Sequence, residues 1–441
     1  MVHSGRIDAG IWLPFDSASI WFHQGVIVTI VSREAATTIY RMKRMARGAR
    51  WIVLSTVLAV LGLLGFWVTI PVWINILLAV ISFVLLFLEI RAHRRALAST
   101  EFVPRFSDSF DSVLLAVANS DRFTYRRFPH GTFLSDALVS SGIENGLEAR
   151  LDAVPFSVPP RLRALSQRFL DEKTKTKHVF DGPILGWNSN VGTADSNLPL
   201  WIDFQPATYF QHIATDQLAL HDVRQNDQFL EDHGRRLFIG RRGMLRDFHE
   251  SWLVNVVGTS CMAFTSDGKL LIVDQGVHNL NSGGQLAPSG SGALESRDFQ
   301  GRTSLPLAEL AANGANRELQ EESGVRPGEI LESSFLGFGR WLEKAARPEL
   351  VTMSLLSVDS HVLEQRITEK LERPFVRGRA FTRLVGGPGD WSSTNPEIML
   401  DSQFRGRLSL PLSVGLALLG EFVAAGGPRA ERFVAQVCAS D

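Results

Sequence analysis

The sequence predicts an α+β protein with an N-terminal two-helix transmembrane hairpin, a connector region and a C-terminal domain of mixed helices and strands. Three observations lead to this prediction. No charged residue occurs from Trp51 to Leu88, an Asp-Gly pair at 267–268 separates two apolar runs, and three glutamates at helical spacing lie within 318–322. These patterns are typical of membrane helices, of a β-hairpin and of a helix with one polar face, respectively.

Composition narrows the functional classes. The chain has 441 residues, so about two or three domains are expected. The formal net charge of -1 argues against a protein that coats nucleic acid, and no DNA partner is expected. The two cysteines, Cys261 and Cys438, cannot build a disulfide framework and lack zinc-finger spacing, which fits a reducing compartment. No secretory signal peptide is apparent.

The first predicted segment, residues 1–48, is expected to lie in the cytosol. Its apolar run Val26–Val31 is rich in β-branched residues and therefore predicts a strand. Met42 and Met45 stand just before the hairpin. An alternative is that translation starts at one of these two methionines.

The transmembrane hairpin is placed at residues 49–90. A single helix needs about 20 apolar residues to cross the hydrocarbon, so the uncharged run is too long for one helix and suits two. Pro71 cannot donate a helical hydrogen bond and marks the turn between them. We therefore predict spans at Trp51–Val68 and Val72–Leu88. The alternative is a buried helical pair in a soluble core.

Basic residues on both sides of the hairpin predict its orientation. Lys and Arg close to a span stay in the cytoplasm, and only an even number of spans keeps both flanks there. We therefore expect a two-span protein with both termini cytoplasmic and with the lipid bilayer as a partner. The flanking basic residues are Arg41, Lys43, Arg44, Arg47, Arg50, Arg91, Arg94 and Arg95.

The rest of the chain divides into a connector or accessory region, 91–185, and a C-terminal domain, 186–441. Apolar residues at helical spacing predict a helix over Arg161–Asp171 in the connector. In the C-terminal domain, the Asp-Gly pair predicts a hairpin between Cys261–Thr265 and Leu270–Val273. The further expected elements are a strand at Leu198–Phe204, a flexible loop that includes Ser289–Gly292, a helix at Leu307–Ser323 ended by Gly324, a strand at Val351–Val358 and a final helix containing Leu416–Val423.

The strongest chemical signal is a group of three glutamates near the end of the predicted helix. Glu318, Glu321 and Glu322 are spaced i, i+3 and i+4, which places their carboxylates on one helix face. Adjacent anions repel each other unless a cation lies among them, and Mg²⁺ or Mn²⁺ prefers such oxygen ligands. The three are therefore candidate metal ligands. The alternative is a solvated Glu-rich helix.

The segment 303–325 resembles the Nudix box, in which Glu309 and the run from Arg317 to Val325 match the family's pattern. The resemblance implies an α/β/α sandwich with a mixed sheet, and a divalent metal at Glu318, Glu321 and Glu322. If the protein is a hydrolase, Glu321 and Glu322 are the implied catalytic residues. The first glycine of the box is replaced by Thr303, and the Gly-rich run lies upstream of the extra residues 293–302. This departure puts hydrolysis in doubt and leaves nucleotide binding plausible.

The hairpin followed by a long connector and a Nudix-like domain resembles the transmembrane–NUDIX effectors of cyclic-oligonucleotide-based anti-phage signalling systems (CBASS). The resemblance implies an effector in the cell inner membrane. Its ligand would be a cyclic oligonucleotide made by a neighbouring nucleotidyltransferase. The hairpin would then form a homo-oligomer that disrupts the membrane and kills the infected cell, because one hairpin cannot line a pore. The alternative is a membrane-tethered, metal-dependent Nudix hydrolase of nucleoside diphosphate derivatives.

A cyclic oligonucleotide needs basic donors for its phosphates and aromatic surfaces for its bases. The segment 235–242 supplies four arginines around Phe238, and we take these arginines as candidate ligand-binding residues. An exposed basic loop is the alternative interpretation, and Arg340 and Arg347 are weaker candidates. The full candidate ligand set is Arg235, Arg236, Arg241, Arg242, Ser289, Gly290, Ser291 and Gly292.

Overall fold

The computed structural model describes most of the chain from residue 100 onward and parts of the first 99 residues. The chain forms two compact units. Unit 1 comprises Met1–Val103, Asp171–Gly182 and Asp222–Glu231, and unit 2 comprises Pro104–Leu170, Pro183–His221 and Asp232–Asp441. The described residues are 13–15, 18–23, 26–31, 71, 73, 74, 76, 77, 80, 81, 83, 84, 87, 88, 100–105, 110–118, 121–176, 181–191, 201–225, 228–230, 233–240, 243–276, 283–367, 376–392 and 395–438.

Unit 1 contains two small three-stranded sheets. The first is antiparallel and joins β1 (Leu13–Phe15), β2 (Ala18–His23) and β3 (Val26–Val31) in that order. The strand predicted at Val26–Val31 is therefore confirmed. The second has the order β11-β10-β4, with β4 at Thr100–Pro104, β10 at His221–Gln225 and β11 at Gln228–Leu230.

Most of the predicted hairpin, including all of Trp51–Val68, lies outside the described residues. The residues described within 73–88 are helical. Their larger apolar side chains are exposed, for example Trp73 at 66%, Phe83 at 71% and Phe87 at 54%. Within the described part of the chain, no single helix meets the length and hydropathy expected of a membrane span. The pair Leu410–Ala425 and Pro428–Cys438, bent by 114°, meets them only when its two helices are taken together.

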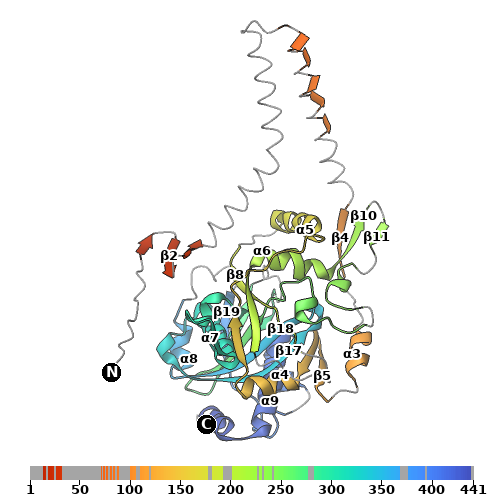
Figure 1. Cartoon of the computed structure of the whole chain (residues 1–441). Helices are drawn as coiled ribbons and strands as arrows, with labels where there is room; N and C mark the ends of the chain where they lie inside the picture. Colours follow the sequence, from red (N-terminus) through yellow and green to blue (C-terminus); the bar gives the residue numbers. More distant parts are fainter. Residues whose placement is uncertain are drawn as a thin grey trace, which may run out of the picture. The chain divides into compact units, whose positions relative to one another are not determined.

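Unit 2 is built around a nine-stranded mixed sheet (Figure 1). Its main path runs β14-β13-β12-β18-β17-β6-β5, and β15 and β19 add to β12 and β13. Within this sheet β12 and β18 run parallel, while the other pairs are antiparallel. The strands are β5 (Phe123–Phe128), β6 (Gly131–Asp136), β12 (Gly258–Phe264), β13 (Leu270–Gln275), β14 (Leu286–Ala287), β15 (Gly290–Ala293), β17 (Ile330–Trp341), β18 (Arg347–Leu356) and β19 (Val376–Thr382).

Helices cover both faces of this sheet. Alternate residues of β12 point to opposite faces, so they pack against different helices. Cys261 and Ala263 pack with Leu319 of α7 (Leu307–Ser323). Met262 and Phe264 belong to a different core, which includes Leu412 and Leu416 of α9 (Leu410–Ala425) and Phe433 of α10 (Pro428–Cys438). The sheet is therefore a middle layer between α7 on one side and α9 with α10 on the other.

A second, four-stranded sheet supports the beginning of α7. Its order is β16-β7-β9-β8. Fully buried Trp187 of β8 shares a core with Leu307 and Leu310 of α7. This packing fixes the first turns of α7, so its last turns are held at a defined place beside the large sheet. The strands are β7 (Glu148–Leu151), β8 (Pro183–Trp187), β9 (Trp201–Thr208) and β16 (Ser304–Pro306).

The remaining helices are shorter or lie at the periphery. The helix predicted at Arg161–Asp171 is found as α5 (Arg163–Thr176). The helix described as final in the sequence is α9, but α10 follows it. The other helical elements are α3 (Asp111–Val117), α4 (Ala137–Glu144), α6 (Tyr209–His212), α8 (Ser360–Glu364), and the short η1 (Ile213–Gln217), η2 (Leu218–Leu220), η3 (Arg235–Leu237), η4 (Phe248–Glu250), η5 (Ser296–Phe299), η6 (Pro327–Glu329), η7 (Leu342–Lys344), η8 (Pro396–Met399) and η9 (Ser402–Phe404).

The mixed α+β prediction is confirmed, and the structure adds one connection that the sequence did not indicate. Strands β5 and β6 lie inside the predicted connector, 91–185, yet β6 pairs with the end of β17 from Gly339 to Trp341. Residues 104–170 accordingly fall in the same compact unit as residues 232–441. The connector region therefore supplies two strands of the large sheet.

Candidate functional site

The candidate site is built on α7, whose bounds agree with the predicted Leu307–Ser323. Its buried face begins with Leu307, Leu310 and Ala311 and continues through Glu318 and Glu322. Gly324 ends the helix in the left-handed conformation, at φ 74°, where glycine carries no Cβ penalty. Two of the three glutamates therefore occupy the inward stripe of an amphipathic helix, where an ionised side chain needs partners.

The Gly-rich run forms a strand against this glutamate face. The prediction of a flexible loop at Ser289–Gly292 is wrong, because Gly290–Ala293 is strand β15 and pairs with β12. A Cβ on Gly290 would lie 2.3 Å from the backbone nitrogen of Leu319, and one on Gly292 would lie 2.1 Å from the Glu318 carboxylate. Such distances exclude a side chain, so glycine permits the close approach of strand to helix.

The structure thus brings together two predicted sets of residues, the Gly-rich run and the glutamates. The backbone N–H of Ser291 donates to the carboxylate of Glu322 at 3.1 Å. The hydroxyl of Ser289 is not available to a ligand, because it accepts from the N–H of Ala263 and donates to the carbonyl of Leu271. Ser289 therefore fixes the start of β15, and Ser291 positions a glutamate.

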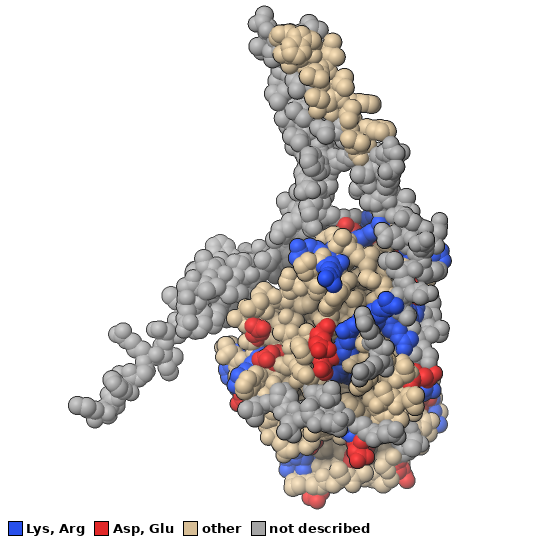
Figure 2. All heavy atoms as spheres, turned by 45° about the vertical axis from the view of Figure 1, so that its right-hand side comes forward, with Lys and Arg blue, Asp and Glu red and all other residues tan. Residues whose placement is uncertain are grey.

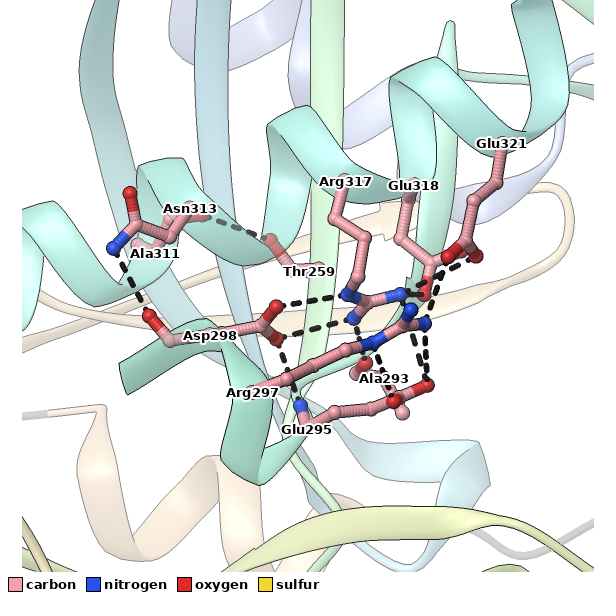
Figure 3. A network of polar contacts seen from close by, with 10 residues as sticks. All are labelled: Thr259, Ala293, Glu295, Arg297, Asp298, Ala311, Asn313, Arg317, Glu318 and Glu321. Carbon is pink, nitrogen blue, oxygen red and sulfur yellow. Dashed lines mark hydrogen bonds and ion pairs between the residues drawn. The ribbon is translucent and has the colours of Figure 1, made fainter. Parts of the chain in front are cut away.

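Arg317 is the centre of the polar network around the glutamates (Figure 3). Its guanidinium binds both carboxylate oxygens of Asp298, at 2.8 and 3.1 Å, and donates to the carbonyl of Ala293 at 2.7 Å. It also lies 2.6 Å from Glu318 and 3.5 Å from Glu321. The Arg317 side chain is 11% exposed and that of Asp298 is 2% exposed, so this pair is shielded from solvent.

A second arginine, Arg297, approaches the same face from η5 (Figure 3). Its guanidinium lies 2.8 Å from Glu295 and 2.7 Å from Glu321. Its side chain is 52% exposed, in contrast to that of Arg317. Arg297, Asp298 and Glu295 all belong to the extra residues 293–302. The extra segment 293–302 therefore places one guanidinium and two carboxylates beside the glutamates of α7.

Glu318 has the clearest electrostatic perturbation in the site. Burial raises the pKa of its carboxyl to about 7, with Glu321 adding to this shift and Arg317 opposing it. Burial alone would lower the pKa of Arg317, but Glu318, Asp298 and Glu295 together hold it well above its ordinary value. The cluster therefore contains more carboxylate than its two guanidinium groups balance.

The donor chemistry of Glu318, Glu321 and Glu322 suits Mg²⁺ or Mn²⁺, which take carboxylate oxygens. Within the described ranges, no three His, Cys, Asp or Glu side chains lie close enough together to hold a metal ion. Glu318 and Glu321 instead pair with Arg317 and Arg297. The metal therefore stays a prediction, and an ion that used Glu321 would compete with Arg297. Glu309, which the sequence did not assign as a ligand, pairs with Arg302.

A polar cleft of about 450 Å³ lies beside this network. It is lined by Arg297 of η5 and Gln300 just after it, and by Asn313 and Gln320 of α7. Leu331 and Glu332, near the start of β17, also line the cleft. The cleft is therefore bounded in part by the inserted segment that carries Arg297.

The described arginines of the predicted ligand segment 235–242 do not line this cleft. Arg235 and Arg236 lie on η3, where Arg235 donates to the hydroxyl of Ser112 at 3.1 Å. Phe238, the expected aromatic surface, is only 4% exposed and packs in a core with Leu237, so it cannot stack on a base. Arg241 and Arg242 lie outside the described residues. On the face drawn in Figure 2, basic and acidic side chains occupy separate small groups rather than one continuous basic surface.

Of the two weaker candidates, Arg340 is buried and Arg347 is partly buried. Arg340 is 6% exposed, and its guanidinium lies 4.0 Å from the centre of the Phe248 ring. Burial lowers the pKa of Arg340 to about 10. Arg347 pairs with Glu349 at 2.8 Å. Both arginines are therefore held by the interior of unit 2, and neither lines the cleft.

Sequence reasoning missed Glu295, Arg297 and Asp298. These residues lie at a short 3₁₀ helix and have no periodicity of their own. A signal for the close packing of β15 was present, since Gly290 and Gly292 are two residues apart and so share one face of a strand. That spacing is typical of a strand face that another group approaches closely, and here the neighbour is α7.

No known protein-family profile matches the chain, and no curated protein matches it. Among solved structures, the chain is similar to DR0079 from Deinococcus radiodurans, with 16% sequence identity and a TM-score of 0.20. The match covers 29% of this chain and 65% of DR0079. At that TM-score the similarity carries no argument about function.

Proposed function

We propose that the protein is a membrane effector of anti-phage defence, in which a Nudix-like cytosolic domain senses a cyclic nucleotide and a two-span hairpin disrupts the inner membrane. The observation that carries the proposal is the exposure of large apolar side chains such as Trp73, Phe83 and Phe87. They belong to an uncharged stretch that extends back to Trp51. Exposed apolar surface on this scale suits a membrane or a partner surface.

The glutamate face supports the sensor half of the proposal. Gly290 and Gly292 allow β15 to reach α7, which keeps the Gly-rich run next to the glutamates. Arg297 and Arg317 neutralise part of the glutamate face. A face that already holds two cations favours recognition of a ligand over metal-assisted hydrolysis. The Mg²⁺ or Mn²⁺ expected at Glu318, Glu321 and Glu322 stays a prediction, because Arg317 and Arg297 already pair with two of these carboxylates.

Ligand binding can act on the hairpin only if the ligand binds two assembly states unequally. Homo-oligomerisation is the simplest such change, because a pore needs more than two helices. The basic flanks of the hairpin support an orientation with both termini in the cytoplasm, where a cyclic oligonucleotide from a neighbouring nucleotidyltransferase would be present.

Liposomes that contain a trapped dye test this proposal. We expect purified protein to release dye when one cyclic di- or trinucleotide is added, and to release none without it. A matched variant, Phe83→Asp, places a charge in the apolar stretch and should abolish leakage while nucleotide binding persists. If every cyclic nucleotide in a broad panel leaves the dye trapped, the effector function is wrong.

The second candidate function is a membrane-tethered Nudix hydrolase of nucleoside diphosphate derivatives. The close approach of Gly292 to the Glu318 carboxylate favours it, because it keeps a Gly-rich backbone next to the candidate metal ligands. Magnesium-dependent release of phosphate or nucleoside monophosphate from a nucleotide panel, lost in Glu321→Gln, would establish hydrolysis. An absence of turnover across that panel would exclude it.

A further inference from the structure

The polar cleft beside α7 is lined by two arginines, several amides and the carboxylates of Asp298 and Glu332. We propose that it holds one nucleotide unit of the ligand, with Arg297 as the phosphate-binding residue and the amides of α7 facing the base and the ribose. This inference rests on the proposed function, since it assigns a place to the ligand of the sensor. It differs from the expectation based on the sequence, which put the phosphates on the arginines of 235–242.

The size of the cleft limits what can enter. Binding sites for small ligands have volumes of about 300–1,000 Å³, and this cleft measures about 450 Å³. It lies near the lower end of that range, so it suits a single nucleotide unit better than a complete cyclic oligonucleotide. The other units of such a ligand would lie outside the cleft.

Arg297 is the group in the cleft that suits a phosphate. An arginine has five N–H donors, and the contacts of Arg297 with Glu295 and Glu321 use Nε and Nη2. Its side chain is 52% exposed, so its outer edge can meet a ligand. Arg317 also borders the cleft, but Asp298 and Ala293 fix its guanidinium. The two arginines therefore have separate roles, one structural and one for binding.

The remaining walls suit a base and a ribose. Gln320 on α7 and Gln300 after η5 offer amide groups, which can donate and accept hydrogen bonds at the edge of a base or at ribose hydroxyls. Asn313 also lines the cleft, with its Nδ2 donating to the carbonyl of Asp298 at 2.9 Å. Leu331 is 63% exposed and adds an apolar surface that one face of a base can cover. A guanidinium, several amides and an apolar surface in one cleft match the parts of a nucleotide.

The test measures binding of single nucleotides and of cyclic dinucleotides to the full-length protein in detergent micelles by isothermal titration calorimetry. Loss of a charge-assisted hydrogen bond to phosphate costs enough for roughly a tenfold weaker affinity. We therefore expect Arg297→Gln to weaken binding at least about tenfold, and Gln320→Ala to weaken it by roughly threefold to tenfold. The matched controls Arg405→Gln and Gln403→Ala, at residues that do not line the cleft, should bind as the unchanged protein does.

Each outcome decides the inference. If the unchanged protein binds a nucleotide and both cleft variants bind it equally well, the ligand lies elsewhere, and the inference is overturned while the sensor function stands. If the unchanged protein binds no nucleotide, the proposed function and this inference both fall. A thermal unfolding scan accompanies each variant. Should Arg297→Gln unfold, the result for Gln320→Ala alone decides.

Discussion

The glutamate face of α7 and the arginine segment at 235–246 are two charged regions of unit 2, and their described side chains differ in how they are paired. On α7, buried carboxylates are each matched by a guanidinium or a backbone N–H. In the arginine segment, the described side chains are held by single contacts, such as Arg235 with Ser112 and Arg246 with the carbonyl of Arg236.

This contrast indicates which charge patterns predict a site. The glutamates recur at helical spacing and share a stripe with apolar core residues, so their burial follows from the helix itself. The arginines follow one another without a period, and their one aromatic neighbour, Phe238, is buried in the core. Helical periodicity therefore predicted the common face of the glutamates, whereas the local density of arginines did not predict where their side chains lie.

The largest expected loss of stability comes from replacing Arg317, the centre of the glutamate network. Arg317→Met leaves Asp298 and Glu318 buried without their main cation, and removal of one partner of a buried ion pair costs about 3–5 kcal/mol. Urea unfolding followed by tryptophan fluorescence measures the free energy of unfolding. Arg235→Met is the matched control from the arginine segment. A loss below about 1 kcal/mol in Arg317→Met would remove the distinction between the two regions.

The second-largest loss of stability is expected from a substitution that disturbs the close packing of β15 on α7. In Gly290→Ala the new methyl group meets the backbone of Glu318 and Leu319, and such overpacking costs about 1–3 kcal/mol. Gly328→Ala is the control, because a Cβ at Gly328 meets nothing within 4 Å. The same unfolding experiment applies. Equal stability of the two variants would show that β15 does not lie against the helix.

The ion pair between Glu329 and Arg366 is expected to contribute less to stability than the two features above. The hydrogen bond from Arg366 lowers the pKa of Glu329 to about 2, against its ordinary value of 4.5. The stabilisation is therefore complete above pH 4.5 and is lost as the pH falls toward 2. Because the pair is partly exposed, we expect Glu329→Gln to cost about 1 kcal/mol or less at pH 7.

Thermal unfolding of Glu329→Gln and of the unchanged protein at several pH values checks this expectation. The difference between the two should shrink as the pH is lowered below 4.5. A difference that stays constant down to pH 3 would mean that the carboxylate is not selectively stabilised in the folded protein.

The smallest effect is expected in the arginine segment. Arg235 makes one exposed hydrogen bond, to Ser112, and surface substitutions of this kind change stability by about 0.5 kcal/mol or less. Arg235→Ala should therefore unfold at the same urea concentration as the unchanged protein. A loss comparable to that of Arg317→Met would show that the arginine segment is structural.

Local patterns predicted the elements whose determinants are local. The Asp-Gly turn appears between β12 and β13, with Gly268 at φ 74°, and α7 has the predicted ends because Gly324 is a strong stop signal. The pairing of β6 with β17 had no such signal. It joins residues as distant as Phe133 and Trp341, whose positions differ by 208 (341 − 133), and pairing over that separation is fixed by the whole fold.

The site was predicted in part for the same reason. Glu318, Glu321 and Glu322 were found by helical spacing, but the charges of Glu295, Arg297 and Asp298 were not connected with them. These three reach α7 through the packing of Phe299, which is fully buried, and not through any repeating pattern. Ser289–Gly292 was associated with the glutamates correctly, although its conformation is a strand rather than a loop.

The pairing of β6 with β17 also affects how the protein is made. Strands β5 and β6 leave the ribosome long before β17, and a strand without its neighbour exposes unpaired backbone groups. β6 can pair with β17 only after synthesis has passed Trp341. During that interval the nascent chain holds an unfinished edge, so chaperone dependence and aggregation of truncated products should depend on whether translation stops before or after this residue.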